Sequence, residues 1–339
     1  MRTRTKAGIV ILAAVLSLLA GAGIGSVSVS PADICRVLAN RLFGSPLPEN
    51  FSSVTPGLVL NIRLPRVTLS FAAGAAAAMG GVVMQSVLKN PLASPYGLGV
   101  SSGAGLGAAL VIVSGLGAGA LGTLALPAVS LAFGLATVGA AIFLSSRLDR
   151  SLSNNTIILT GMVLSLFTNA LMSTVSAANP EYSQRILLWQ LGSFSGRGWE
   201  ASAMVAAVAA VCLAGFLRLS PELDAMTFGE EQARALGVEL RRVKWVLIVL
   251  VAALTGTSVA FAGVIGFVDL IAPHVVRRFF GARHRLVLPM AALLGGAFMT
   301  VCDLAARTLA SPSEIPVGSI TALIGAPFFL YVYFSHRRR

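Results

Sequence analysis

Charge is what the sequence has least of. Asp, Glu, Lys and Arg together account for 11% of the 339 residues, whereas soluble domains contain roughly a quarter. Hydrophobic residues account for 56%, and the mean hydropathy is +0.84. So few polar side chains cannot cover the surface of a soluble domain. The composition therefore excludes a soluble protein and predicts a polytopic membrane protein.

Motifs for chemistry are also missing. No G-x-x-x-x-G-K-[ST] pattern occurs, so the chain has no P-loop with which to bind ATP. Its 3 cysteines and 3 histidines lack the spacing of a metal site or of a disulfide framework. We therefore expect no metal and no cofactor on this chain. The net charge of +12 comes from short basic clusters beside the predicted spans, which favours anionic lipid over nucleic acid as a partner.

Long runs without Asp, Glu, Lys or Arg predict the membrane spans. Crossing about 30 Å of hydrocarbon takes roughly 20 residues of helix. The segment 267–281 is shorter and contains Pro273, which predicts a short or partial helix. One span is predicted for each of 7–32, 67–88, 151–180, 201–217, 245–268, 286–302 and 315–335, and two for 90–146. We therefore expect an all-α polytopic membrane protein with ten transmembrane helices in a single domain, 1–339.

An even number of spans places both termini on one side of the membrane. Most of the 25 Lys and Arg residues fall on the side that also holds the termini, and this bias predicts that both termini are cytoplasmic. A cleaved signal peptide at the N-terminus is the alternative. It would leave an odd number of spans and remove the charge asymmetry.

One stretch, "TFGEEQARALGVELRRVK" (227–244), departs from the low charge of the chain. Glu230 and Glu231 would begin a short helix, where acidic residues favour the positive end of the helix dipole. Arg234 follows one turn later, and Gly237 can end the helix. The surrounding loop, 219–243, is predicted to be cytoplasmic. Composition alone leaves two interpretations open, a solvated loop or a docking surface for a soluble partner.

Ionisable residues inside the predicted membrane region are few. Only Asp269 and Asp303 come near to qualifying, and both fall at predicted span ends. Asp303 lies four residues before Arg307, a spacing that predicts an ion pair within one helix. A secondary carrier of a bulky solute would have more buried ionisable groups, and we find no catalytic constellation for a polytopic membrane enzyme. These two classes stay open as alternatives, and the few buried ionisable groups favour an energy source outside this chain.

Five long blocks resemble, in the right order, the permease subunits of type II ABC importers, the family for ferric siderophores, haem and vitamin B12. The blocks are "NIRLPRVTLSFAAGAAAAMGGVVMQSVLKNPLASPYGLGVSSGAGLGA" (61–108), "LLWQLGSFSGRGW" (187–199), "GEEQARALGV" (229–238), "GFVDLIAPHVVRRFFGARHRLVLP" (266–289) and "IPVGSITALIGAPFFLYVYF" (315–334). The resemblance implies a multi-pass homodimer in the cytoplasmic (inner) membrane, with the substrate path on its two-fold axis. It also implies two ATP-binding subunits that hold ATP and Mg, and a periplasmic or lipid-anchored binding protein. The implied cargo is a ferric siderophore first, with haem and cobalamin next.

The resemblance also implies three sets of functional residues. A helix that fits into a cleft of the ATPase is matched by Gly229, Glu230, Glu231, Arg234, Leu236 and Gly237. Docking of the acidic binding protein is matched by Arg63, Arg66 and Arg307, whose charges would steer and orient it. One cytoplasmic gate is matched by Asn90 and Leu92. Asn154 and Asn155 fall at the other gate, where the vitamin B12 permease has different small polar residues, and Met84 and Gln85 could line the path. Structural alternatives are membrane-interface anchoring for Arg63 and Arg66, and core packing for Met84.

One position departs from the family. Where the family usually reads F-V-G-L, this chain has Asp269 in "FVDL", which we predict to lie near the outer face. The carboxylate could alter the turn between the seventh and eighth spans, pair with a basic neighbour or touch the substrate. The sequence does not choose among these.

Overall fold

Each of the ten predicted spans coincides with a helix of the computed structural model, which describes residues 3–25, 29–48, 51–116, 122–149 and 152–337. The helices are α1 (Thr3–Gly23), α4 (Leu64–Val87), α5 (Val100–Ser114), α6 (Ala125–Leu148), α7 (Asn154–Ala178), α9 (Trp199–Arg218), α12 (Leu240–Ala262), α13 (Val268–Phe280), α14 (His284–Thr308) and α15 (Val317–Arg337). Seven are long and apolar enough to cross a membrane, and α5 and α15 contain shorter apolar helices. The short α13 contains Pro273, as predicted. The all-α membrane fold is thereby confirmed.

Short helices outside the spans were not predicted. They are α2 (Pro31–Phe43), α8 (Pro180–Gln190) and α10 (Ser220–Phe228). Each has a proline in its first turn, where the missing N–H costs nothing and the fixed φ suits a helix. The remaining short elements are α3 (Val54–Gly57), η1 (Leu58–Arg63), η2 (Pro95–Leu98), α11 (Glu230–Ala235) and η4 (Gly122–Leu124). The π-helical η1 joins α3 to α4 without a break.

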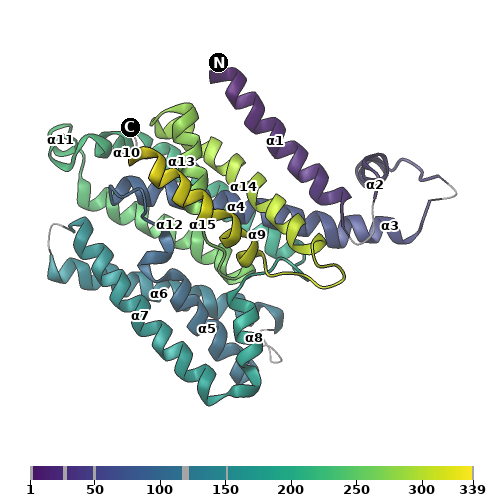
Figure 1. Cartoon of the computed structure of the whole chain (residues 1–339), viewed down its shortest axis with the longest axis horizontal. Helices are drawn as coiled ribbons and strands as arrows, with labels where there is room; N and C mark the ends of the chain where they lie inside the picture. Colours follow the sequence, from purple (N-terminus) through teal and green to yellow (C-terminus); the bar gives the residue numbers. More distant parts are fainter. Residues whose placement is uncertain (1–2, 26–28, 49–50, 117–121, 150–151, 338–339) are drawn as a thin grey trace.

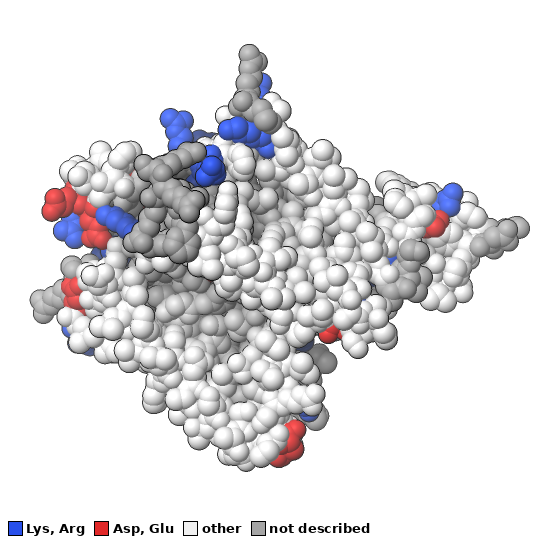
Figure 2. Space-filling view, in the orientation of Figure 1, with Lys and Arg blue, Asp and Glu red and all other residues white. Residues whose placement is uncertain are grey.

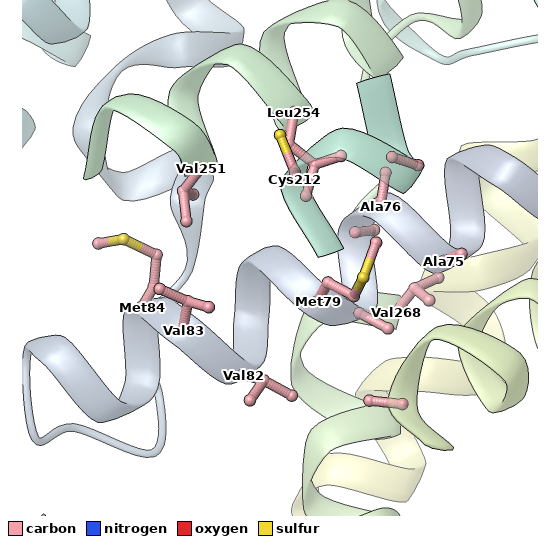
Figure 3. Close-up of a cluster of buried hydrophobic side chains, with 14 of the residues drawn as sticks. Ala75, Ala76, Met79, Val82, Val83, Met84, Cys212, Val251, Leu254 and Val268 are labelled. Atoms are coloured by element: carbon pink, nitrogen blue, oxygen red, sulfur yellow. The ribbon is translucent and has the colours of Figure 1, made fainter. Parts of the chain in front are cut away.

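Helix α4 is the centre of the bundle. Its most apolar stretch is 89% buried, whereas the corresponding stretches of α1, α6, α7 and α9 are about one-third buried or less. Figure 3 shows Val83 and Met84 of α4 beside Val251 of α12, and Met79 near Cys212 and Leu254. A helix enclosed on all sides needs no polar face, which explains the run of small apolar residues along α4.

Helices α4 and α14 cross at two glycines. A methyl group on Gly74 would lie 2.3 Å from the carbonyl oxygen of Gly295. A methyl group on Gly295 would lie 2.5 Å from the Ala78 side chain. Small residues at such a crossing let two membrane helices approach closely and gain van der Waals contact. The alanine- and glycine-rich sequence of α4 therefore specifies its packing partner.

The ends of the bundle differ from its middle. In Figure 1 the start of α1, the end of α15, α10 and α11 lie toward the upper left, whereas α2, α3 and α8 lie toward the other end. In the space-filling view the broad middle of the visible face carries almost no charge, and the charged side chains gather at the ends (Figure 2). This is the distribution that a bilayer imposes, because charges leave the hydrocarbon layer.

Candidate functional site in the coupling loop and gates

Two short helices, α10 and α11, lie between the end of α9 and the start of α12, and the charged stretch 227–244 covers α11 and the first turns of α12. Helix α11 begins at Glu230 and ends at Ala235, after which Gly237 adopts a φ of 83°. The N–H of Gly237 donates to the Arg234 carbonyl at 2.9 Å. A positive φ is available to glycine at no steric cost, so Gly237 ends the helix as predicted. Helix α12 begins at Leu240, which makes the loop shorter than the predicted 219–243.

The outward side of α11 combines charge with an exposed apolar side chain. Glu231 and Arg234 are exposed, and Leu236 is 71% exposed. Ala233, on the opposite side, is fully buried and anchors the helix. Beside α11 lies an open hollow of about 840 Å³, lined by Arg218, Leu219, Pro221, Glu222, Ala225, Leu236, Gly237, Val238, Glu239, Arg242, Val243 and Val246. Because Leu236 is exposed at the edge of this hollow, α11 offers an apolar surface that a protein partner can cover.

Glu230 faces inward, unlike Glu231. Its carboxylate accepts a hydrogen bond from the Lys244 ammonium group at 2.9 Å. Lys244, the last residue of the charged stretch, lies in the first turns of α12 with a side chain that is 1% exposed. The same ammonium group donates to the Asn154 side chain at 3.0 Å. The predicted coupling helix and a predicted gate residue are thus bonded to one buried cation.

The two predicted gate segments lie against each other. Asn154 begins α7, and Asn155 beside it is exposed. The side-chain oxygen of Asn90 accepts from the Leu92 N–H at 2.9 Å, which fixes the turn that leads into η2. Helix α7 packs closely on η2. A methyl group on Gly161 would lie only 2.7 Å from the Gly97 carbonyl oxygen. The two segments that carry the predicted gate residues are therefore in direct contact, at Gly161 and Gly97.

The predicted path residues on α4 are enclosed. Met84 is fully buried in the core shared with Val251 (Figure 3). Gln85 is 5% exposed, donates to the Asp269 carbonyl oxygen at 3.1 Å and accepts from Arg277. In this conformation both side chains pack inside the subunit and do not line an open path.

Asp269 lies in the first turn of α13, next to the connection from α12, and it contacts Gln85 and Ser94. Its side chain is buried, and Oδ2 accepts from the Ser94 hydroxyl group. The other oxygen, Oδ1, has no hydrogen-bond partner within the described ranges. The Asp269 carbonyl oxygen would clash with any side chain at Gly81, so α4 and α13 touch through backbone. Of the alternatives left open, the described contacts show a hydroxyl group and not a basic neighbour as the partner of the carboxylate.

A chain of buried polar groups continues from Gln85 toward the coupling loop. Arg277 donates to Gln85 and, at 3.3 Å, to the Ser86 hydroxyl group. Ser86 is 2.6 Å from His284 Nε2, and His284 Nδ1 is 2.6 Å from the Asp224 carboxylate on α10. Sequence analysis missed this network, because its members are separated by 60 to 198 residues along the chain.

The three arginines predicted for docking lie together, but their side chains are mostly buried. The guanidinium groups of Arg63 and Arg307 both approach Gly25. Arg63 donates to the Ala22 and Gly23 carbonyl oxygens at 3.0 and 2.7 Å. Arg307 donates to the Gly21 carbonyl oxygen and lies 3.8 Å from the Asp303 carboxylate, the predicted pair within α14. These contacts tie η1, α14 and the end of α1 to one another.

Arg66 makes the strongest contacts of the three. Its guanidinium group donates to both oxygens of the fully buried Asp303, at 2.9 to 3.1 Å. It also donates to both oxygens of Glu314 at 2.7 and 3.0 Å. Glu314, in the connection between α14 and α15, has its pKa lowered by these hydrogen bonds from Arg66. One cation therefore holds two carboxylates that lie more than 230 residues away in sequence.

Comparison with known proteins fits this arrangement. Residues 10–335 match the FecCD transport family. The chain belongs to the FecCD transport family. It is thus a permease subunit of an ABC importer and not an enzyme, and ATP hydrolysis belongs to partner ATPases. All the FecCD relatives described next match over most of their own length.

An uncharacterised ABC transporter permease protein of Bacillus subtilis (strain 168), YvrB, is 39% identical over 95% of this chain and 91% of its own. The Fe(3+)-citrate import system permease protein YfmE of the same organism is 35% identical over 97% of this chain and 95% of its own. A solved structure, described as an inward-facing conformation of a metal-chelate type ABC transporter, has a TM-score of 0.85 at 31% identity. It covers 98% of this chain and 99% of the other.

Proposed function

We propose that this FecCD permease forms a homodimer in the cytoplasmic membrane and imports an iron chelate, with a ferric siderophore as the first choice. Two ATP-binding subunits, which hold ATP and Mg, would dock on α11, and a binding protein would deliver the chelate from outside. The proposal rests on the difference between the two sides of α11. Its outer side exposes Glu231, Arg234 and Leu236, while its inner side is bonded through Lys244 to the start of α7.

The proposed orientation follows from charge. The start of α1, the end of α15, α10 and α11 lie toward one end of the bundle (Figure 1), where basic side chains are prominent (Figure 2). Basic residues are retained on the cytoplasmic side of membrane proteins. The ATPase subunits are cytoplasmic in this proposal, which requires α11 to be at that end.

The proposed mechanism is alternating access. A loaded binding protein docks outside, ATP closes the motor subunits, and α11 passes their movement to the gate segments at Asn90, Leu92, Asn154 and Asn155. At the far end, Arg63, Arg66 and Arg307 are the proposed docking cations. Because Arg66 is already held by Asp303 and Glu314, an acidic partner would engage it by displacing the partly exposed Glu314.

The choice of cargo is supported by the relatives. One relative is named for Fe(3+)-citrate, and the matching structure is described as a metal-chelate type transporter. The test is uptake of labelled ferric siderophores, haem and cobalamin by cells that lack this chain, with and without its restoration. We expect uptake of ferric siderophore to be lost and recovered. If only haem uptake or only cobalamin uptake is lost and then recovered, that compound is the cargo instead. Normal uptake of all three by cells that lack the chain would reject all three cargoes.

The role of α11 is tested by Glu231→Ala combined with Arg234→Ala. The change removes two exposed charges from the proposed ATPase surface and leaves the buried Ala233 in place. We expect the reconstituted complex to bind the ATPase more weakly or to hydrolyse ATP without uptake. Arg36→Ala, an exposed cation on α2 at the other end of the bundle, is the control and should leave both unchanged. Unchanged uptake by the α11 variant would contradict the assignment.

A further inference from the structure

Lys244 is a buried cation whose three donors go to three different acceptors. The side chain extends from α12 and is 1% exposed. Its Nζ donates to the Glu230 carboxylate at 2.9 Å, to the Asn154 side-chain oxygen at 3.0 Å and to the Leu152 carbonyl oxygen at 3.0 Å. An ammonium group has three hydrogens, so these acceptors satisfy all of them. Helix α11, the segment before α7 and α7 itself therefore meet at one atom.

The segment that Lys244 holds has an unusual backbone. Leu152 has a φ of 53°, a left-handed conformation that bulky residues rarely adopt. On one side the Asp149 carboxylate accepts from the Ser153 N–H at 3.0 Å. On the other side the Leu152 carbonyl oxygen accepts from Lys244. The start of α7 is thus kept in place by contacts from outside the helix, and Lys244 supplies one of them.

Resting on the proposed function, we propose that Lys244 is the positioning residue that carries movement of α11 to the inner gate at Asn154 and Asn155. The connection needs only two hydrogen bonds, which Lys244 donates to the Glu230 carboxylate and to the Asn154 side-chain oxygen. Both involve a charged group in a water-poor interior, where hydrogen bonds are strong and an unpaired group is costly. A displacement of α11 must therefore move the start of α7 or break a buried charged contact.

The same geometry separates the two neighbouring acids of α11. Glu231 is exposed and available to a partner protein. Glu230 is directed inward to Lys244. The two adjacent glutamates thus have different roles in coupling. Glu231 contacts the ATPase, and Glu230 passes the movement of α11 on to Lys244.

The test uses the full transporter, reconstituted with its ATPase and binding protein, in a background in which all three cysteines are replaced by alanine. Asn155→Cys then reports on the gate through its rate of maleimide labelling, with and without ATP and vanadate. We expect Lys244→Met and Glu230→Gln each to retain the ATPase and hydrolyse ATP. Both should lose the nucleotide-dependent change in labelling and the uptake that depends on it. If Lys244 and Glu230 only stabilised the fold, the two variants would lose ATPase binding together with the labelling response.

Two further variants sharpen the result. Arg241→Met removes an exposed cation from the same end of α12 and should respond to nucleotide as the parent does. The double variant Lys244→Met/Glu230→Gln should lose no more than either single variant, because both changes break one connection. If Lys244→Met does not assemble, Glu230→Gln decides alone, since it keeps the size of the side chain and removes the negative charge that pairs with Lys244.

The outcomes separate the two proposals. A normal labelling response in Lys244→Met or, where that variant does not assemble, in Glu230→Gln would overturn the role of Lys244 and leave the proposed function intact. Failure of the parent complex to couple ATP to uptake would overturn the proposed function, and the role of Lys244 with it.

Discussion

Arg66 holds a buried ion pair with Asp303. Asp303 is 0% exposed and lies at the centre of the contact, while Glu314 reaches it from a connection outside the membrane helices. Taking such charges out of water is unfavourable, and their mutual contacts offset that cost only while every partner is present. The pair thereby ties α4 to α14 and to the connection before α15.

Replacing Arg66 should destabilise the fold. Arg66→Met leaves the buried Asp303 with only the more distant Arg307 as a counter-ion, and removing one partner of a buried pair costs about 3–5 kcal/mol. The double variant Arg66→Met/Asp303→Leu removes both charges and should recover part of this loss, because Arg307 then loses its carboxylate. The free energy of unfolding of the detergent-solubilised protein is the measurement. Equal values for the single variant and the natural chain would show that the pair does not stabilise the fold.

Glu314 should make stability depend on pH. Hydrogen bonds from Arg66 lower its pKa below the ordinary value of 4.5. A lowered pKa means that its contribution is complete above pH 4.5 and is lost as the pH falls through the folded-state pKa. Between pH 5 and pH 3 the natural chain should lose more thermal stability than Glu314→Gln does. Glu181→Gln, which removes an exposed carboxylate on α8, is the control, and parallel curves for all three chains would exclude the effect.

At the scale of the helices, the crossing of α4 and α14 is the contact most sensitive to size. A methyl group on Gly295 would lie 2.5 Å from Ala78 and 2.6 Å from the Gly74 carbonyl oxygen. Gly295→Ala should therefore cost about 1–3 kcal/mol through overpacking. Gly139→Ala on α6 is the matched control, because nothing lies within 4 Å of its added methyl group. Gly139→Ala should be neutral or stabilise the protein by up to about 1 kcal/mol. A higher unfolding midpoint for Gly295→Ala than for Gly139→Ala would contradict this packing.

Helices could be predicted from the sequence where local signals specify them. Runs without charge located the spans, and Gly237 located the end of α11. The helices α2, α8 and α10 were missed, although Pro31, Pro180 and Pro221 each follow a polar residue and open the helix, a recognised start signal. A search of the loops for that signal would have found them. Their shortness and lack of a long apolar run hid them from a search for spans.

At the scale of the whole molecule, the sequence predicted the class and the family but not the buried polar contacts. Lys244 ends the charged stretch 227–244, and nothing in the sequence marked it as buried, because a lysine near a span end ordinarily extends to water. Its burial depends on Asn154 and Glu230, 90 and 14 residues away. The contacts of Arg66 and His284 are longer in range still. No periodicity or short motif encodes a pairing between helices that only the assembled bundle brings together.

The enclosure of α4 also bears on how this chain can diverge over evolution. A helix with neighbours on every side accepts no larger side chain, and it accepts a polar one such as Gln85 only where a buried partner is within reach. Helices α1, α6 and α9 turn most of their surface away from the protein interior. Neutral drift should therefore accumulate on these three helices while α4 changes slowly. Descendants of an ancestral gene could come to differ in most of their outward-facing residues and still keep an almost unaltered central helix.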